Sequence, residues 1–327
     1  MELPKALGRR EKESLHPPGW DVTFHDGLRV SRAIAGTNAA SPLPFVSVIL
    51  PTIGRSSLES SIRTILKSNY PRFELLVVHD EQRLGSSIAR NLALKIARGD
   101  VIHFAEDDCE YAPSNLRALV EKYLSVHIHD RRCVGIVGSF IPPVWGSRAV
   151  MIRISTSRQG IKVGVFQGEG RTDYLATGNA LCSKQVILQC GGFNEQYSHM
   201  FEDLELSLVL KRNGFTLYNC NQAVARHRNE PRGEKFALRL LSGTAYLGAR
   251  NSVLLHKTWC SHPLTYVARR LASDLRRSIS SQRRAEIGQD IQWQRTAERR
   301  RLLDRIAYLF GFIAGLVSKP ARRTTLG

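Results

Sequence analysis

Three consecutive carboxylates, Glu106, Asp107 and Asp108, follow the apolar run Val101–Ala105. The run has strand character, so the charged cluster is expected at the carboxyl end of a strand and not inside it. Ligands of open α/β sheets bind at this edge, and clustered hard oxygens suit a divalent cation and the phosphates that it neutralises. The alternative for such a cluster is a solvated acidic turn.

Alternating strands and helices are expected to position these carboxylates. Apolar runs predict the strands, and apolar residues at helical spacing predict the helices between them. The expected elements of the first half are the strand Phe45–Leu50, a helix over 58–66, the strand Leu75–Val78 ending at His79-Asp80, the helix Ile88–Ala97, the strand that reaches Glu106, and the helix Asn115–Leu124. This alternation predicts a parallel, doubly wound α/β sheet.

The second half of the chain is predicted to hold shorter elements. Ile141–Gly170 is rich in Gly, Pro and Ser, which indicates an insertion or a pair of edge strands. The other expected elements are the strand Cys133–Phe140, the turn Thr177-Gly178-Asn179, a short helix before Gly191-Gly192, the helix Phe201–Leu210, and the strands Phe215–Cys220 and Ala223–Ala225, which lead into Arg226-His227-Arg228.

The composition indicates a folded protein with a full hydrophobic core. The chain has 327 residues, of which 43% are apolar, and this favours one large domain with an appendage. No apolar run follows the first basic residues, and the stretch Ile306–Val317 is shorter than the roughly 20 residues that span a bilayer. We therefore expect a cytoplasmic chain whose six cysteines are reduced thiols and not zinc ligands.

The net charge is +18, from 47 Lys and Arg against 29 Asp and Glu, and it implies an anionic partner. From Arg269 to the last residue, fourteen Lys and Arg stand against five Asp and Glu, a difference of +9. Anionic lipid, phosphorylated substrate and nucleic acid all fit this charge. A basic motif interleaved with aromatic residues is missing, so we expect no nucleic-acid partner.

The two ends of the chain differ from its middle. Residues 1–44 contain Pro-Pro, several Gly and no long apolar periodicity, so we expect an irregular N-terminal arm. Residues 236–327 are expected to form a basic helical region with an apolar stripe. The stripe consists of Leu302, Ile306, Leu309, Ile313 and Leu316, with Leu303, Phe310 and Val317 beside them. It fits packing onto the core or a second subunit, and it also fits a helix in a membrane interface.

Six segments, in this order, resemble family-2 inverting glycosyltransferases of the GT-A type. They are VSVILPTIGR (46–55), LLVVHD (75–80), GSSIARNLALKIARGDVIHFAEDD (85–108), TGNALCS (177–183), GGFNEQYSHMFEDLELSLVLKRNGF (191–215) and AVARHR (223–228). The resemblance implies a Rossmann-like, mostly parallel sheet flanked by helices. It also implies a catalytic domain over 45–235, with a nucleotide-binding half over 45–125 and an acceptor half over 126–235.

The resemblance implies a divalent cation, Mn²⁺ or Mg²⁺, that neutralises the leaving diphosphate. Asp108 would be its carboxylate ligand, and His227 would be its imidazole ligand. Asp107 would lie near the ribose or sugar of the donor. Glu106 departs from the Asp-x-Asp pattern of the family, and we assign it no specific role. The alternative for His227 is an ordinary surface histidine.

Donor binding is expected to involve residues at the same sheet edge. The resemblance places Asp80 at the nucleotide base, although a helix-capping role is the alternative. It places Thr52 and Arg90 beside the nucleotide, and the alternative for Arg90 is an exposed helix face. Gly178 and Asn179 would line the pocket between donor and acceptor.

Asp203 is the residue that we expect to carry the chemistry. An inverting transfer needs a base that takes the proton of the acceptor hydroxyl, and the family has the Asp of Glu-Asp in this role. Glu202 and Glu205 are expected on the acceptor side. The alternative is that Glu202 and Asp203 only favour a helix N-terminus through the helix dipole.

These features predict a metal-dependent, inverting hexosyltransferase-type enzyme of cell-surface polysaccharide or glycolipid synthesis. Its donor would be a UDP-, GDP- or dTDP-sugar, and its acceptor a glycan or a lipid-linked sugar. A location at the inner face of the membrane is expected if the C-terminal region binds lipid, and the sequence leaves an oligomer open. The alternatives are a non-catalytic relative that binds nucleotide sugar and a basic nucleic-acid-binding protein.

Overall fold

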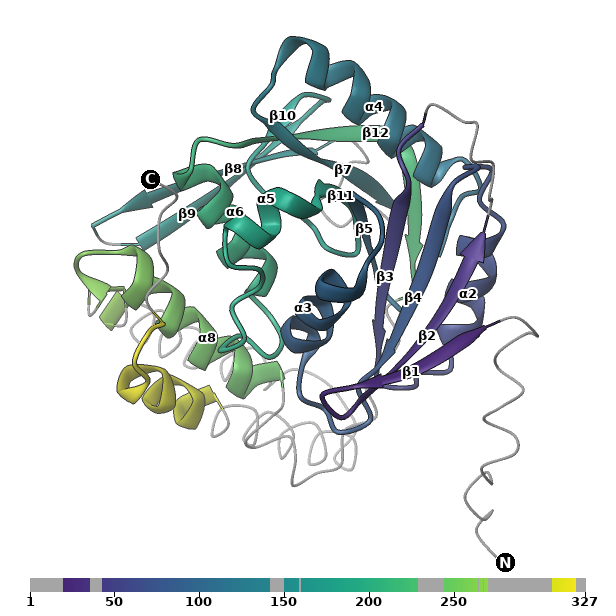
Figure 1. The fold of residues 1–327 in the computed structure, drawn as a ribbon. Coiled ribbons are helices and arrows are strands. Elements are labelled where there is room, and N and C mark those ends of the chain that lie inside the picture. Colours follow the sequence, from purple (N-terminus) through teal and green to yellow (C-terminus); the bar gives the residue numbers. More distant parts are fainter. Residues whose placement is uncertain are drawn as a thin grey trace, which may run out of the picture.

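A computed structural model describes residues 20–35, 43–141, 150–158, 160–228, 244–263, 265, 266, 268, 269 and 308–321 (Figure 1). A ten-stranded sheet runs through the molecule. In spatial order its strands are β1 (Asp21–His25), β2 (Leu28–Ala35), β4 (Phe73–His79), β3 (Val46–Thr52), β5 (Val101–Ala105), β11 (Asn179–Ser183), β7 (Cys133–Ile141), β12 (Thr216–His227) and β10 (Arg171–Thr172), and β6 (Cys109–Tyr111) pairs with β12.

The central strands of the sheet share one direction, with the exception of β11. β3 pairs in parallel with β4 and β5, and β12 pairs in parallel with β7. Between these two groups lies β11, which is antiparallel to both β5 and β7. The expected α/β class, with mostly parallel central strands flanked by helices, is confirmed. The carboxyl ends of β3, β4 and β5 therefore meet at one edge, where the predicted site residues follow.

Helices cover both faces of the sheet (Figure 1). On one face α2 (Leu58–Leu66) and α4 (Asn115–His129) share a buried apolar cluster with Val48 and Leu50, whereas on the other α3 (Ser86–Ile96), α5 (Lys184–Gln189) and α6 (Glu202–Arg212) share one with Ile49 and Val78. Alternate residues of a strand point to opposite faces, which explains why these strands are apolar throughout. Each such fully buried side chain contributes about 1.5 to 3 kcal/mol.

The N-terminal part of the chain was expected to be an irregular arm, and this was wrong for residues 20–35. β1 and β2 form a hairpin, and β2 pairs antiparallel with β4 along its whole length. Asp26 and Gly27 both have positive φ, 47° and 80°, as a two-residue hairpin turn requires. The Asp-Gly pair between alternating apolar residues is the signal that the prediction overlooked. Residues 1–19 and 36–42 lie outside the described part.

Two further predictions concern the strands expected within 141–170 and within 215–225. Within Ile141–Gly170, β8 (Val150–Ser157) and β9 (Gly160–Gln167) form a separate antiparallel hairpin, which confirms the expected pair of strands. The two short strands expected near 215–225 are one strand, β12, interrupted between Cys220 and Val224 by a shift in register. Residues 229–243, which follow β12, lie outside the described part.

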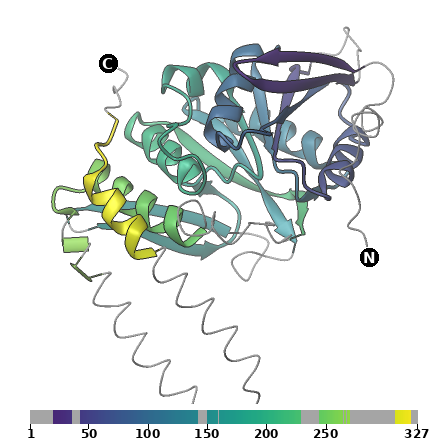
Figure 2. The same ribbon diagram turned by 90° about the horizontal axis from the view of Figure 1, so that it is seen from below.

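The described C-terminal residues form two neighbouring helices, as expected for a helical extension. α8 (Thr244–Trp259) packs against β8 through Leu254 and Leu255. A helix over 308–317 lies alongside α8 (Figures 1 and 2). The basic residues between 270 and 307, with Leu302 and Ile306 of the predicted stripe, lie outside the described part. In the residues that the structure describes, no helix is long and apolar enough to cross a bilayer.

Candidate active site

The segments at the carboxyl ends of β5 and β12 meet at the edge of the sheet. β6 pairs antiparallel with β12, and the register sets His227 opposite Cys109. The amide of Arg228 donates to the carbonyl of Asp108 at 2.8 Å, which extends this pairing to the carboxylate turn. Strand pairing therefore brings the predicted ligands Asp108 and His227 together, although they are far apart in the sequence.

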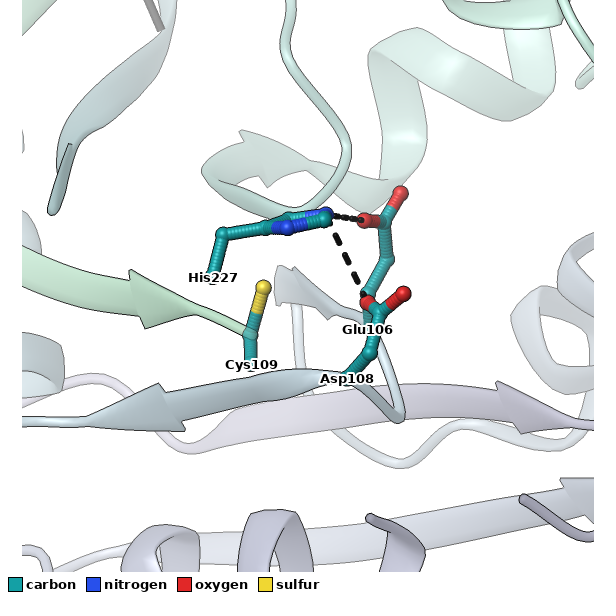
Figure 3. Close-up of side chains that lie close together, drawn as sticks. All are labelled: Glu106, Asp108, Cys109 and His227. Atoms are coloured by element: carbon teal, nitrogen blue, oxygen red, sulfur yellow. Dashed lines mark ion pairs between the residues drawn. The ribbon is translucent and has the colours of Figure 1, made fainter. Parts of the chain in front are cut away.

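Side chains of Glu106, Asp108, Cys109 and His227 lie close together (Figure 3). Nε2 of His227 lies 3.6 Å from Oδ1 of Asp108 and 3.9 Å from Oε2 of Glu106. One candidate ligand atom from each of the four residues lies within 4.8 Å of the others. Around an octahedral ion with bonds of about 2.1 Å, ligand atoms lie about 3 to 4.2 Å apart. Two carboxylates and an imidazole so placed fit a divalent cation such as Mn²⁺ or Mg²⁺.

Cys109 is the least suitable ligand of this group. Its side chain is fully buried, and burial raises the pKa of the thiol well above its usual range, with Glu106 and Asp108 adding to the effect. A protonated thiol is a poor ligand, and a hard ion prefers oxygen. We therefore expect Cys109 to pack beside the site and not to bind the ion.

Asp107 is held by residues at the end of β3. Its Oδ2 accepts a hydrogen bond of 2.6 Å from the hydroxyl of Thr52, and its Oδ1 lies 3.4 Å from Nε of Arg55. The guanidinium of Arg55 also pairs with Asp108 through Nη1. Burial raises the pKa of Asp107, although Thr52 and Arg55 oppose the shift. Arg55 was not predicted as a site residue, yet it is the cation that balances both carboxylates.

We expect Arg55→Met to tighten the binding of Mn²⁺ by roughly tenfold when no nucleotide is present. The guanidinium competes with the ion for Asp108, and a unit charge at about 4 Å in a partly buried site contributes a few kcal/mol before solvent screening. Titration of Mn²⁺ followed by electron paramagnetic resonance measures the affinity. Arg63→Met is the control, because Arg63 forms an exposed pair with Glu59 on α2. Equal or weaker binding by Arg55→Met would contradict this role.

Gly178 lies directly against the ligand Glu106. A Cβ at Gly178 would lie 3.0 Å from Oε2 of Glu106 and 3.2 Å from the ring of Phe140. The hydroxyl of Tyr111 joins the two segments, because it donates to the carbonyl of Gly178 and accepts from the amide of Glu106, each at 2.8 Å. Gly178 therefore sits beside the group, and its missing side chain leaves room for the carboxylate. A place for Gly178 between donor and acceptor stays a prediction.

Asn179 has an internal role, which corrects the expectation that it lines the pocket. The side chain is fully buried. Its Oδ1 lies 3.2 Å from Nε2 of His103 and accepts from Asn115 at 3.0 Å, and its Nδ2 donates to the carbonyls of Ser139 and Ala223, each at 3.2 Å. These bonds tie β11 to its neighbours inside the sheet.

Asn179→Ala is expected to lower the free energy of unfolding by about 3 kcal/mol, because it leaves several buried polar groups without their partner. Affinity for Mn²⁺ should stay within about twofold of the unchanged protein. Urea denaturation gives the stability. Asn69→Ala, at an exposed amide that accepts only from Arg117 in the described contacts, should change it by less than about 0.5 kcal/mol. A variant of normal stability that binds donor poorly would restore the pocket assignment.

Arg90 is buried between two acidic residues, which corrects the alternative of an exposed helix face. It is 2% exposed. Its Nη1 lies 3.0 Å from Oε1 of Glu202, and its Nη2 lies 3.7 Å from Oε1 of Glu106. Burial raises the pKa of Glu106 to about 7, and Arg90 opposes this shift. Arg90 thus links the carboxylate group to the start of α6, and its contact with a donor stays a prediction.

Glu202 and Glu205 are both buried, so the expectation that they contact the acceptor is corrected. Glu205 is fully buried. Glu202 accepts from the hydroxyl of Ser86 at 2.8 Å and pairs with Arg90. Burial acts to raise the pKa of Glu202, but Arg90, His199 and Ser86 outweigh it and hold that pKa below its usual value. Glu202 therefore stays ionised and anchors α6.

Asp80 holds the turn that precedes α3 and forms no side-chain cap of that helix, so the capping alternative does not describe it. Its two carboxylate oxygens accept from the amides of Leu84 and Gly85, each at 2.7 Å. Gly85 begins α3 with a φ of 120°, and a Cβ there would lie 2.5 Å from the carbonyl of Ser198. The carboxylate thus shapes the turn between β4 and α3. Contact of Asp80 with a base stays a prediction.

Asp203 lies in the first turn of α6, half-buried beside Glu202. Its Oδ1 accepts from the amide of Leu204 at 2.7 Å, and its Oδ2 accepts a hydrogen bond from the hydroxyl of Tyr174. Burial and the Glu202 carboxylate raise the pKa of Asp203 to about 7. The pKa values of these two neighbouring acids therefore shift in opposite directions. Glu202 is ionised, and Asp203 can exchange a proton near neutral pH.

Sequence reasoning missed Tyr174 and Arg55, which contact predicted carboxylates, and Tyr111, whose hydroxyl accepts from the backbone amide of Glu106. Arg55 lies within the quoted segment VSVILPTIGR, so its charge beside the end of a strand was a usable signal. Tyr174 and Tyr111 gave none, because an aromatic residue in an apolar run predicts packing.

A family model matches the middle of this chain. The model of the family described as "Glycosyl transferase family 2" matches residues 75–187. That segment runs from β4 to α5 and contains the carboxylate turn and Gly178. Residues 75–187 are thus similar to glycosyl transferase family 2. This confirms the resemblance seen in the sequence, and the sheet described above agrees with the expected GT-A class.

Beyond the family-2 segment, a longer likeness extends along the chain. This chain is 21% identical over 250 residues to the "Putative teichuronic acid biosynthesis glycosyltransferase TuaG" of Bacillus subtilis (strain 168). The alignment covers 66% of this chain and 93% of the relative. Two solved structures are similar in fold, each at 16% identity. They are GalNAc-T7 with UDP, GalNAc and Mn²⁺ (70% of this chain, 51% of that chain, TM-score 0.49) and the mannosyltransferase PcManGT from Pyrobaculum calidifontis with GDP-Man and Mn²⁺ (94%, 92%, 0.47). This chain thus spans about half of the GalNAc-T7 chain.

Proposed function

We propose that this protein is a metal-dependent, inverting glycosyltransferase that moves a sugar from a nucleotide diphosphate to an acceptor hydroxyl. The observation that carries the proposal is the linked arrangement of two sites. Glu106, Asp108 and His227 form a group fit for a divalent cation, and Arg90 connects this group to Glu202, next to Asp203. Donor phosphates and an acceptor base are the two requirements of the reaction.

Each side of this arrangement has its own task. A divalent cation bound by Asp108 and His227 would supply positive charge against the leaving diphosphate. Asp107 and Thr52 would hold the ribose or sugar beside it. Asp203 would accept the proton of the attacking hydroxyl, since its raised pKa of about 7 makes it a base suited to neutral pH.

Inversion follows from the presence of a single base. One carboxylate that activates the acceptor allows one direct displacement at the anomeric carbon, whereas retention through a covalent intermediate needs a second nucleophile placed against the donor. Glu202 does not supply it, because its carboxylate is buried and paired with Arg90. A relative named for teichuronic acid biosynthesis supports a glycan or lipid-linked acceptor in a biosynthetic pathway.

A panel of UDP-, GDP- and dTDP-sugars tests the proposal. With Mn²⁺ present, we expect slow hydrolysis of one nucleotide class and tight binding of the matching nucleotide diphosphate. Proton NMR of fresh product should show the anomeric configuration opposite to that of the donor. Retention would disprove the inverting mechanism. Binding without any turnover, with or without candidate acceptors, would favour the non-catalytic relative.

A further inference from the structure

The helix over 308–317 presents apolar residues on two opposite faces. Phe312 is buried, and with Leu316 and Tyr308 it packs on Ala249 and Val253 of α8. The other face carries four large apolar side chains that are 49% to 77% exposed. These are Leu309, Phe310, Ile313 and Val317. In this helix, part of the predicted stripe packs on the protein, which was one of the two alternatives. The four exposed side chains point to solvent, and we name them the outward face.

Two glycines fix which face meets α8. A Cβ at Gly311 would lie 2.1 Å from the carbonyl of Tyr246, and one at Gly315 would lie 2.7 Å from the carbonyl of Arg250. Only a residue without a side chain allows the two helix backbones to approach this closely. A rotation of the helix about its axis would bring larger side chains into this contact, so the outward face cannot turn inward.

The end of the helix is also fixed to the catalytic part of the protein. Nζ of Lys257 donates to the carbonyls of Leu316 and Ser318 at 2.5 and 2.6 Å, which satisfies groups left open at a helix C-terminus. The amide side chain of Gln196 bonds to the carbonyl of Lys319 at 2.9 Å and to the amide of Ala321 at 2.8 Å. The outward face is thus held in a fixed orientation.

The charge of the chain selects among the surfaces that could cover this face. The protein carries +18, and residues 269–327 alone carry +9. A second copy carries the same charge and would be repelled, whereas a bilayer with acidic headgroups attracts each nearby basic residue by about 1 kcal/mol. Lys319 is exposed at the end of the helix, and Arg269 is exposed near the end of α8.

We propose that the outward face docks on an anionic lipid bilayer. The helix over 308–317 is about 15 Å long at 1.5 Å per residue, half of a hydrocarbon core, so it would lie in the interface and not cross it. Its four apolar side chains would enter the boundary between headgroups and acyl chains. The inference goes beyond the proposed function, because it requires neither donor nor metal and can be tested without them.

Flotation of the full chain with lipid vesicles tests this surface. We expect binding to phosphatidylcholine vesicles that contain about a quarter phosphatidylglycerol, and weaker binding as NaCl rises from about 0.1 M to about 0.5 M. The double substitution Phe310→Glu with Ile313→Glu should lower the vesicle affinity by at least about tenfold. The matched control is Val22→Glu with Phe24→Glu, which adds the same charge at two exposed apolar positions of β1 and should change the affinity by less than about threefold.

Several results would overturn the proposal. These are failure of the unchanged chain to float, equal flotation of the outward-face variant, and equal binding to vesicles of phosphatidylcholine alone. A dimer in sedimentation analysis that the outward-face variant dissociates, without vesicle binding, would assign the face to a second copy. Thermal unfolding shows whether the double variant is folded. If it is not, Val317→Glu, at the most exposed of the four positions, gives the same test with a smaller loss of about threefold.

Discussion

Asp203→Asn is expected to abolish sugar transfer, with a loss in kcat of about 10³-fold or more, and to leave donor affinity within about twofold. The carboxylate is replaced by an amide of the same size that cannot accept a proton, and general-base catalysis typically contributes 10² to 10⁴ in rate. The donor side should be unaffected, because Asp203 contacts Tyr174 and the amide of Leu204 and none of Glu106, Asp108 or His227 in the described hydrogen bonds.

The pH dependence of transfer provides a second readout of the same residue. Burial and Glu202 raise the pKa of Asp203 to about 7, and only the deprotonated form can accept a proton. The value of kcat/KM should therefore rise as pH increases through about 7, and below that it should fall about tenfold per pH unit. Tyr174→Phe removes the hydrogen bond that opposes the shift, so the midpoint should move upward. A strong loss of donor binding in folded Asp203→Asn would refute the assignment.

Asp108→Asn is expected to weaken Mn²⁺ binding by about 100-fold or more and to remove metal-dependent binding of the nucleotide diphosphate. The substitution keeps the size of the side chain and removes its charge from a group in which, among the described residues, three side chains offer oxygen or nitrogen atoms to an ion. Calorimetric titration with Mn²⁺, with and without nucleotide, measures both effects without any turnover. His227→Ala should lose about 10- to 100-fold by the same measurement.

The matched control for Asp108→Asn is Asp100→Asn. Asp100 is exposed just before β5, at the end of that strand opposite to the site, so the same loss of charge should leave Mn²⁺ affinity nearly unchanged. Metal binding that survives in Asp108→Asn but is lost in Cys109→Ser would show instead that the thiol is the ligand. That result would contradict the hard-ion interpretation of the site.

The main elements of the fold were predictable because their strands are buried on both faces. Continuous apolar runs such as Leu75–Val78 identify central strands, and the site residues follow directly at their ends. The β1–β2 hairpin was missed because its strands are half-exposed and alternate in polarity, so they add no long apolar run. β11 was not predicted as a strand, since only the turn Thr177-Gly178-Asn179 was expected there, and its antiparallel place between β5 and β7 depends on non-local pairing that no local pattern records.

The sequence identified most residues of the candidate site, but it predicted their individual roles less well. Asp108 and His227 carry groups that few structural tasks require at a strand end, and the structure brings them together. We expected Asn179 to line the pocket between donor and acceptor, and Glu202 and Glu205 to lie on the acceptor side. The side chains of all three are instead buried inside the protein. A motif gives the position of a polar residue, whereas the direction of its side chain depends on partners elsewhere, such as Arg90 for Glu202.

The pairing of β6 with β12 has a consequence for how the chain folds. Asp108 precedes β6, and His227 ends β12, the last strand of the main sheet in the sequence. The two predicted ligands meet only after this long-range pairing has formed, which places the candidate metal site among the late, non-local contacts of folding. A cation held there would stabilise the completed sheet over every partly folded chain, by about 2.7 kcal/mol at a hundredfold excess over its Kd. A nascent chain that has not yet reached β12 would gain none of this stabilisation.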